Sequence, residues 1–205
     1  MHYRRLAVGM VPAFVGRLSF TGDLGYELWV PPDRLATLYD QLFAAGADLG
    51  LRDVGLRALN AMRLEKNFGT WAREYRPIYG PTEAGLGRFV NLKKGDFIGR
   101  DAAAIEKAEG GKLRLVTLVV DADDAEGMGA DVVGDEPVRL DGQTIGWVTS
   151  GGYAHHIARS IALAYVSRDH AIEGAVFEVE ILDTMRKATL ITQPIFDPNG
   201  GRMRS

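Results

Sequence analysis

The sequence contains no cysteine among its 205 residues. Disulfide bonds, thiolate zinc sites, iron–sulfur clusters and cysteine nucleophiles are therefore excluded. It also contains no run of about 18 apolar residues, the length that a helix needs to cross a bilayer. Residues 1–10 are basic but lack the apolar stretch of a signal peptide, so the sequence predicts a cytoplasmic protein with no membrane partner.

The charge is nearly balanced, with 24 basic and 27 acidic residues and a net charge of −3. Because no long basic run occurs, we expect no nucleic-acid partner and no binding to an anionic membrane. The hydrophobic share of 46% and the charged share of 25% are those of an ordinary globular protein. The length suffices for one large domain or two small ones, and the 25 glycines indicate many turns.

Two halves are distinguishable, and we predict domains at 1–111 and 112–205. The first half mixes strand and helix patterns, which is typical of an α+β domain. Pro31 and Pro32 stop a strand, and Asp33 is a suitable cap for the helix that follows. The expected strands are 15–20, 26–30 and 88–92, and the expected helices are 33–46, 53–66 and 101–107.

The second half contains strand patterns only, separated by turn residues such as Asp141-Gly142 and Gly151-Gly152. The expected strands are 113–120, 136–140, 144–149, 160–166, 176–182 and 187–192. Six short strands with no helix between them indicate a small barrel or sandwich.

The sharpest local feature is the glycine-bounded turn at 21–25 and the strand that follows it. Strand alternation puts Glu27 and Trp29 on the same face. A carboxylate has two coplanar acceptors, which match the adjacent N–H and amine of a pterin as they would match a guanidinium. A carboxylate beside an aromatic wall therefore suits a pterin site, although a hairpin whose Glu27 simply faces solvent would have the same sequence pattern.

Several short motifs resemble those of the aminomethyltransferase (glycine cleavage T-protein) family, and they occur in family order. They are T-G-D-L-G-Y-E at 21–27, L-N-A-M-R-L-E-K at 59–66, T-E-A-G-L at 82–86, D-F-I-G-R at 96–100, V-T-S-G at 148–151, S-I-A-L-A-Y-V at 160–166 and P-I-F-D-P at 194–198. The segments 71–79 and 149–156 further resemble the sarcosine and dimethylglycine dehydrogenase branch.

The resemblance implies an α+β domain, mixed in strands and helices, followed by a small six-stranded antiparallel β-barrel. It implies tetrahydrofolate as cofactor and a small methylamine as donor of the one-carbon unit, which leaves as 5,10-methylenetetrahydrofolate. By the same resemblance Glu27 would hold the pterin. The other residues expected near the folate are Phe20, Arg63, Trp71 and Tyr79.

The sequence departs from the family pattern at several positions. The family's catalytic aspartate belongs to a region ahead of the one matched here, so no catalytic residue is assigned. Phe20 and Phe196 stand where tyrosines are common, and Leu59 stands where glycine-cleavage enzymes have an arginine. We therefore expect a folate-binding portion that needs an N-terminal catalytic or flavin-bearing partner. The alternatives are a non-catalytic folate-binding or assembly module and a self-associating homodimer.

Some candidates have a structural interpretation that competes with the functional one. Arg63 could support the folate site or form a surface pair, and Trp71 and Tyr79 could wall the folate or pack their loop onto the core. His155 and His156 are adjacent and would point oppositely on a strand, so no metal site is predicted there.

Overall fold

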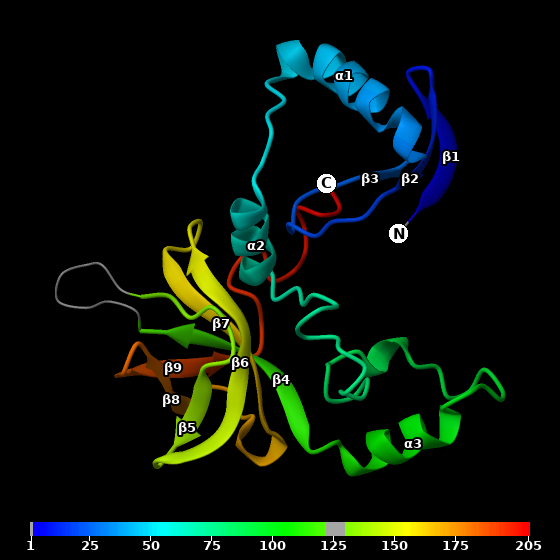
Figure 1. Cartoon of the computed structure of the whole chain (residues 1–205). Coiled ribbons are helices and arrows are strands. Elements are labelled where there is room, and N and C mark those ends of the chain that lie inside the picture. Colours follow the sequence, from blue (N-terminus) through cyan, green and yellow to red (C-terminus); the bar gives the residue numbers. More distant parts are fainter. Residues whose placement is uncertain (1, 122–129) are drawn as a thin grey trace. The chain divides into compact units, whose positions relative to one another are not determined.

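The computed structural model describes residues 2–121 and 130–205, and the chain forms two compact units (Figure 1). Unit 1 comprises Met1–Met62 together with Asn199–Ser205, and unit 2 comprises Arg63–Pro198. The boundary between the units falls within helix α2 (Leu56–Glu65), after Met62. The domain division after residue 111 stays a prediction.

Unit 1 contains a three-stranded antiparallel sheet in the order β1-β2-β3. Its strands are β1 (Tyr3–Val8), β2 (Val11–Gly16) and β3 (Glu27–Trp29). β2 alternates strictly at its start, with Val11 and Ala13 buried and the residues between and after them exposed. One face of the sheet therefore belongs to the core of unit 1, and the other face is open.

Helix α1 (Leu35–Gly46) follows a 3-10 turn at Pro32–Arg34, as the two prolines and Asp33 predict. It lies beside the β1–β2 hairpin in Figure 1. The backbone N–H of Met10, in that hairpin turn, donates to Oε1 of Gln41 on α1 at 3.2 Å. Leu38 is the buried apolar residue of this helix, and with Val11 and Ala13 it accounts for the small core of unit 1.

Unit 2 begins with the end of α2 and a long series of turns before helix α3 (Arg100–Glu109). The strand predicted at 88–92 is wrong, because Gly87–Phe89 is a 3-10 helix. The N–H of Phe89 donates to the carbonyl of Leu86 at 2.9 Å, so this segment satisfies its backbone locally. Helix α3 lies between Gly99 and Gly110, both at positive φ, and it includes the helix expected at 101–107.

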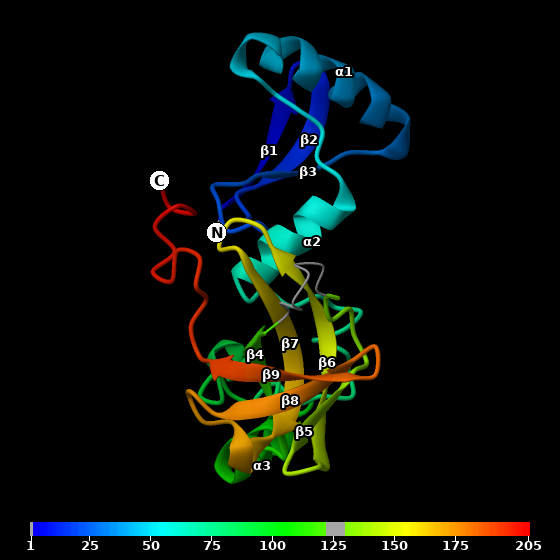
Figure 2. The same ribbon diagram turned by 90° about the vertical axis from the view of Figure 1, so that its left-hand side faces the viewer.

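The rest of unit 2 is a closed antiparallel barrel in the order β4-β7-β6-β5-β8-β9 (Figure 2). Its strands are β4 (Leu113–Val120), β5 (Pro137–Leu140), β6 (Gln143–Ala154), β7 (Arg159–Ser167), β8 (Val176–Ile181) and β9 (Thr184–Ile191). The prediction of a mixed α+β region followed by a six-stranded antiparallel β-barrel is confirmed. The interior is apolar, with Leu118, Val148, Phe177 and Val179 each no more than 2% exposed.

No helix in the described part of the chain is long and apolar enough to span a bilayer.

Candidate functional site

Glu27 lies on the open face of the unit 1 sheet. The register pairs Glu27 with Gly16 and Trp29 with Phe14 across β2 and β3. Cross-strand partners share a face, so Glu27, Trp29 and Phe14 point to the same side. Glu27 and Trp29 are exposed. The alternation argument therefore placed these two side chains together correctly, and the role of Glu27 at a ligand stays a prediction.

The same face carries a wall of aromatic rings. Tyr3 and Phe14 stack with their centroids 5.3 Å apart, and the indole of Trp29 lies 6.2 Å from Tyr3 at a tilt. Gly16 makes room for that indole, because a Cβ added there would lie 2.7 Å from Cη2 of Trp29. The guanidinium of Arg5 lies 5.9 Å from the centroid of Phe14 and adds a cation to the wall.

The turn before Glu27 is fixed by short-range contacts. The N–H of Gly22 donates to Oγ of Ser19 at 3.0 Å. Arg202, from the C-terminal segment of unit 1, forms an ion pair with Asp23. Phe20 lies in this bend and is half-buried. The strand predicted at 15–20 is wrong beyond Gly16, where β2 ends and the chain turns.

In unit 2, Arg63 belongs to a buried network around Glu74. Arg63 is 2% exposed and Glu74 is fully buried. Nη1 of Arg63 lies 3.5 Å from Oε2 of Glu74 and donates to the carbonyl of Phe68 at 3.1 Å. The same Oε2 accepts from the backbone N–H of Thr70 at 2.7 Å, and Oε1 accepts from the hydroxyl of Ser150.

This network makes the surface-pair interpretation of Arg63 wrong, because its partner is a buried carboxylate in the next loop. Burial lowers the pKa of Arg63 below its ordinary value, and the charges of Glu74 and Tyr75 oppose that shift. A buried charge is tolerated only when it is paired and hydrogen-bonded. Glu74 meets both conditions, so it fixes the 69–81 loop to the barrel. A supporting role of Arg63 at a folate site stays a prediction.

The two aromatic residues expected in the same loop differ in their surroundings. Tyr79 stacks on Tyr165 of the barrel, with centroids 3.8 Å apart. The hydroxyl of Tyr165 donates to the carbonyl of Glu74 at 2.8 Å, and burial raises its pKa above the ordinary value. Trp71 is 74% exposed. Tyr79 therefore packs its loop onto the core, whereas Trp71 presents its ring outward.

Phe20 and Glu27 belong to unit 1, and Arg63, Trp71 and Tyr79 belong to unit 2. Inside unit 2 the network of Glu74 joins the segments that carry the last three residues.

His155 and His156 both contact neighbouring residues of unit 2. The backbone N–H of His156 donates to Oε1 of the buried Glu65 at 2.7 Å, and its ring meets Phe196 edge-on at 4.7 Å between centroids. The neighbouring His155 has an edge contact with Tyr153. The described residues contain no group of three histidine, aspartate or glutamate side chains placed to hold a metal ion.

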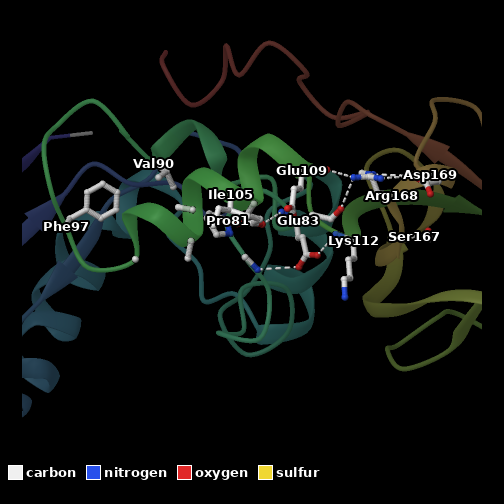
Figure 3. A pocket seen from close by; sticks show the side chains of 16 residues that line it. Pro81, Glu83, Val90, Phe97, Ile105, Glu109, Lys112, Ser167, Arg168 and Asp169 are labelled. Carbon is white, nitrogen blue, oxygen red and sulfur yellow. Dashed lines mark hydrogen bonds and ion pairs between the residues drawn. The ribbon is translucent and has the colours of Figure 1, made fainter.

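A groove of about 1090 Å³ runs along α3, with Val90, Phe97 and Ile105 among its apolar lining residues (Figure 3). Two of its carboxylates are engaged with backbone. Glu83 accepts from the N–H groups of Lys112 at 2.8 Å and Leu113 at 3.1 Å.

Burial alone would raise the pKa of Glu83, but the N–H donors of Lys112, Leu113 and Gly80 stabilise the anion, and the net pKa is lowered. Glu106 of α3 accepts from the N–H groups of Thr82 and Glu83 at 2.9 and 3.1 Å. These carboxylates hold the 80–86 turn between α3 and β4, so the T-E-A-G-L motif at 82–86 has a structural role in this fold.

Comparison with known proteins agrees with both parts of this architecture. A model of the GCVT N-terminal domain matches residues 1–94, and a model of the glycine cleavage T-protein C-terminal barrel domain matches residues 114–197. The chain belongs to the glycine cleavage T-protein family. Dimethylglycine dehydrogenase from Mus musculus, a mitochondrial protein, is 41% identical over 95% of this chain and 22% of its own length.

Two further members show how much of a relative the chain represents. An aminomethyltransferase from Caldanaerobacter subterraneus subsp. tengcongensis is 33% identical over 95% of this chain and 50% of its own length. The crystal structure of aminomethyltransferase T from Bartonella henselae superposes with a TM-score of 0.81 at 23% identity, covering 91% of this chain and 50% of that one. The chain thus spans about half the length of the aminomethyltransferases and about a fifth of the dehydrogenases it matches.

Sequence reasoning missed Glu74, the centre of the buried network that fixes the 69–81 loop to the barrel. Its only signal was a glutamate inside an aromatic-rich segment that has several arginines. It also missed the buried Lys66, whose Nζ lies 3.2 Å from Oδ2 of Asp197 and ties the P-I-F-D-P segment to the end of α2. Both carboxylates pair with residues distant in sequence, which periodicity does not reveal.

Proposed function

We propose that this chain is the tetrahydrofolate-binding portion of a one-carbon transferase acting on glycine-derived methylamines, and that turnover needs an N-terminal catalytic region. The observation that carries the proposal is the position of Glu27 on the aromatic face of unit 1, beside Trp29. Family membership and the names of the relatives, which are aminomethyltransferases and dimethylglycine dehydrogenases, support it.

The chemistry of the open face fits a pterin. A pterin is flat, has two adjacent N–H donors at one edge and stacks well on an aromatic ring. Trp29 and Tyr3 offer ring faces, and Glu27 offers two acceptors on the same side of the sheet. The absence of a side chain at Gly16 lets the indole of Trp29 cover the position opposite Glu27.

The residues of this chain would bind and orient the cofactor. When bound, tetrahydrofolate supplies the N5 and N10 amines that receive the one-carbon unit. Glu27 would hold the pterin edge through two charge-assisted hydrogen bonds, and Trp29 would limit its tilt and shield one face from water. Fixing the ring in this way reduces the freedom that the reacting amines lose in the transition state.

The experiment that tests the proposal is calorimetric titration of the chain with tetrahydrofolate, beside a Glu27→Gln variant. The amide keeps the shape but replaces one acceptor with a donor that faces the pterin donors. We expect binding about 10- to 100-fold weaker, since a hydrogen bond to a charged group contributes about 1.5–3 kcal/mol. Asp40→Asn, an equal charge change at an exposed position of α1, is the matched control and should bind normally.

Equal affinity of the Glu27→Gln variant and the unmodified chain would exclude Glu27 as the pterin ligand. No binding by any of the three proteins would mean that the proposed site is incomplete in this chain. Tetrahydrofolate binding would then be measured with longer proteins of the family.

A non-catalytic assembly module is the second candidate, and the exposure of the aromatic face favours it. Tyr3 is 61% exposed, and Phe14 and Trp29 are each 43% exposed. Exposed aromatic clusters often mark interaction surfaces. Sedimentation equilibrium would test this alternative: a homodimer that Trp29→Ser dissociates supports it, and a monomer at all concentrations removes it.

A further inference from the structure

Unit 1 has few buried side chains for its size. In its described part, the buried apolar residues are Val11 and Ala13 of β2 and Leu38 of α1. A small folded unit needs a larger apolar core than this to be stable by itself. Leu35 and Tyr39 of α1 are 60% and 48% exposed, so the helix and the sheet cover each other only in part. The unit therefore presents surface that a partner would bury.

The edge strand β1 shows where this cover is missing. Leu6 opposes Ala13 in the register with β2, so its side chain points to the face of the sheet that carries the core. Ala13 is 2% exposed, whereas Leu6 is 47% exposed. The two residues face the same layer, and they differ because β1 lies at the edge of the sheet and β2 at its centre. A further strand beyond β1 would bury Leu6.

The opposite edge of the sheet is less suited to pairing. β3 has three residues, and Pro31 and Pro32 follow it closely. Short strands and prolines are means by which proteins blunt a sheet edge. β1 has six residues, contains no proline and pairs with β2 over its whole length without a register shift. β1 is therefore the edge that can accept a strand.

Hydrogen-bond alternation fixes which backbone groups of β1 face outward. The N–H of Arg17 donates to the carbonyl of His2 at 2.8 Å, so β1 directs the backbone groups of residues 2, 4, 6 and 8 to β2. Pro12, which has no N–H, opposes Ala7 and agrees with this alternation. The open edge consequently presents the N–H and carbonyl groups of residues 3, 5 and 7.

The sequence of β1 is complementary to a second copy of itself in one register. If the core faces of two copies lie on the same side of an antiparallel sheet, two-fold symmetry sets one residue of β1 against the same residue of the partner. Pairing centred on Arg4 or on Arg5 places like charges directly opposite each other, which is destabilising. Pairing centred on Tyr3 or on Ala7 runs past an end of the strand and shortens the ladder.

Pairing centred on Leu6 avoids both faults. It sets Arg5 against the partner's Ala7 and Arg4 against the partner's Val8, so both arginines oppose uncharged residues. Leu6 opposes the partner's Leu6 on the core face, where each side chain removes the other from water.

We propose that a second copy of this chain adds to the open edge of β1 across a two-fold axis, with Leu6 opposite the partner's Leu6. Arg5 and the partner's Ala7 exchange two backbone hydrogen bonds, and symmetry gives two more. The two three-stranded sheets become one continuous antiparallel sheet. The aromatic face that carries Glu27 and Trp29 stays open, because the contact uses the strand edge and the core face.

Single cysteines test the register directly, since the chain has no cysteine of its own. The Cα atoms of a non-hydrogen-bonded antiparallel pair lie about 4.5 Å apart, within the range of a disulfide. We expect Leu6→Cys to form a disulfide-linked dimer under mild oxidation. Val8→Cys is the matched control, because its two copies would lie about 13 Å apart along the strands and cannot be bridged. Equal cross-linking of both variants would show random collision and overturn the inference.

Sedimentation equilibrium of the full chain measures the association itself. We expect a reversible monomer–dimer equilibrium that Ala7→Pro weakens at least tenfold. Proline removes the outward N–H of this position, and with it two of the four hydrogen bonds between the copies, but takes no bond from the ladder with β2. Circular dichroism checks that the variant keeps its fold, and the cysteine experiment stands without it.

Trp29→Ser separates this dimer from an assembly through the aromatic face. It changes the aromatic face and leaves the edge intact, so it should dimerise like the unmodified chain. Dissociation by Trp29→Ser, with Ala7→Pro unchanged, would place the interface on the aromatic face and overturn the inference. A monomer at all concentrations would overturn it too, and would leave the edge of β1 for a strand of a longer protein. None of these measurements uses tetrahydrofolate, so a failure of folate binding leaves their result intact.

Discussion

The three strands of unit 1 pair in the order β1-β2-β3 and leave β1 and β3 at the edges, whereas the six strands of unit 2 close into a barrel. Most of β1 is exposed, and its sheet presents aromatic rings to the outside. In the barrel, β7 is buried along nearly its whole length. Closure removes edges and creates an interior, so apolar residues in unit 2 stabilise the fold. In unit 1 the aromatic residues of the open face remain available for a ligand.

The sharpest test of this comparison is truncation of one phenylalanine in each unit. Phe177 is 2% exposed in the barrel and Phe14 is 43% exposed on the open face. Phe177→Ala should lower the free energy of unfolding by about 4 kcal/mol, because it leaves a cavity in a packed interior. Phe14→Ala should lower it by only about 1 kcal/mol, the scale of one aromatic pair. Urea denaturation measures both, and equal losses would contradict the comparison.

Removal of the buried carboxylate at Glu74 should have the next largest effect. Glu74→Ala should destabilise the chain by about 3 kcal/mol, since it leaves Arg63 buried without its partner. Chemical denaturation gives the value, with the double variant Arg63→Met, Glu74→Met as control. If the double variant is as unstable as the single one, the unpaired charge is not the cause.

Gly16 should be the position of the open face that is most sensitive to substitution by a larger residue. Gly16→Ala places a Cβ 2.7 Å from the indole of Trp29, which has to move. We expect a loss of about 1–2 kcal/mol in stability, as for other overpacked sites, and weaker tetrahydrofolate binding. Denaturation and calorimetry check the two effects separately. Gly55→Ala is the control for the backbone, because Gly55, like Gly16, is not at positive φ and has nothing within 4 Å of the added Cβ.

The smallest effect concerns the turn held by Glu83. The pKa of this carboxyl is lowered from 4.5 on folding, so the unfolded chain takes up a proton first as the pH falls. The carboxylate's contribution to stability is therefore present above pH 4.5 and is lost as the pH falls through its folded-state pKa. Glu83→Gln should reduce stability at pH 7 and flatten the acid limb of the stability curve. Thermal unfolding from pH 7 to pH 3 compares the two proteins, and parallel acid limbs would exclude this role.

Several elements with a clear period or punctuation were predicted well from the sequence, whereas the turn predicted at Gly151-Gly152 is wrong, because β6 continues through both glycines to Ala154. The strand expected at 113–120 is β4 with the same bounds, and Asp141-Gly142 joins β5 to β6 with both residues at positive φ. The face shared by Glu27 and Trp29 also followed from alternation alone. These features depend on neighbours in sequence, where side-chain direction and turn conformation are set locally.

The strands expected at 15–20 and 88–92 show where such reasoning ends. Both segments have strand-forming residues. The first leaves the ladder after Arg17, whose N–H donates to the carbonyl of His2, and then turns, and the second closes local 3-10 turns. Strand propensity becomes a strand only where a neighbour supplies the ladder. The surface-pair interpretation of Arg63 was wrong for a related reason, because its partner Glu74 lies eleven residues away in a loop rather than on its own helix.

By itself the sequence determined the class of fold, the order of its elements, the family resemblance and the placement of a carboxylate beside an indole. These follow from local periodicity, glycine and proline positions, and ordered motifs. The tertiary structure alone decided that Glu74 is buried among Arg63, Thr70 and Ser150, that Tyr79 packs on Tyr165, and that Arg88, Arg114 and Asn67 line one cleft. Each of these also depends on a residue of a barrel strand that is distant in sequence, namely Ser150, Tyr165 or Arg114.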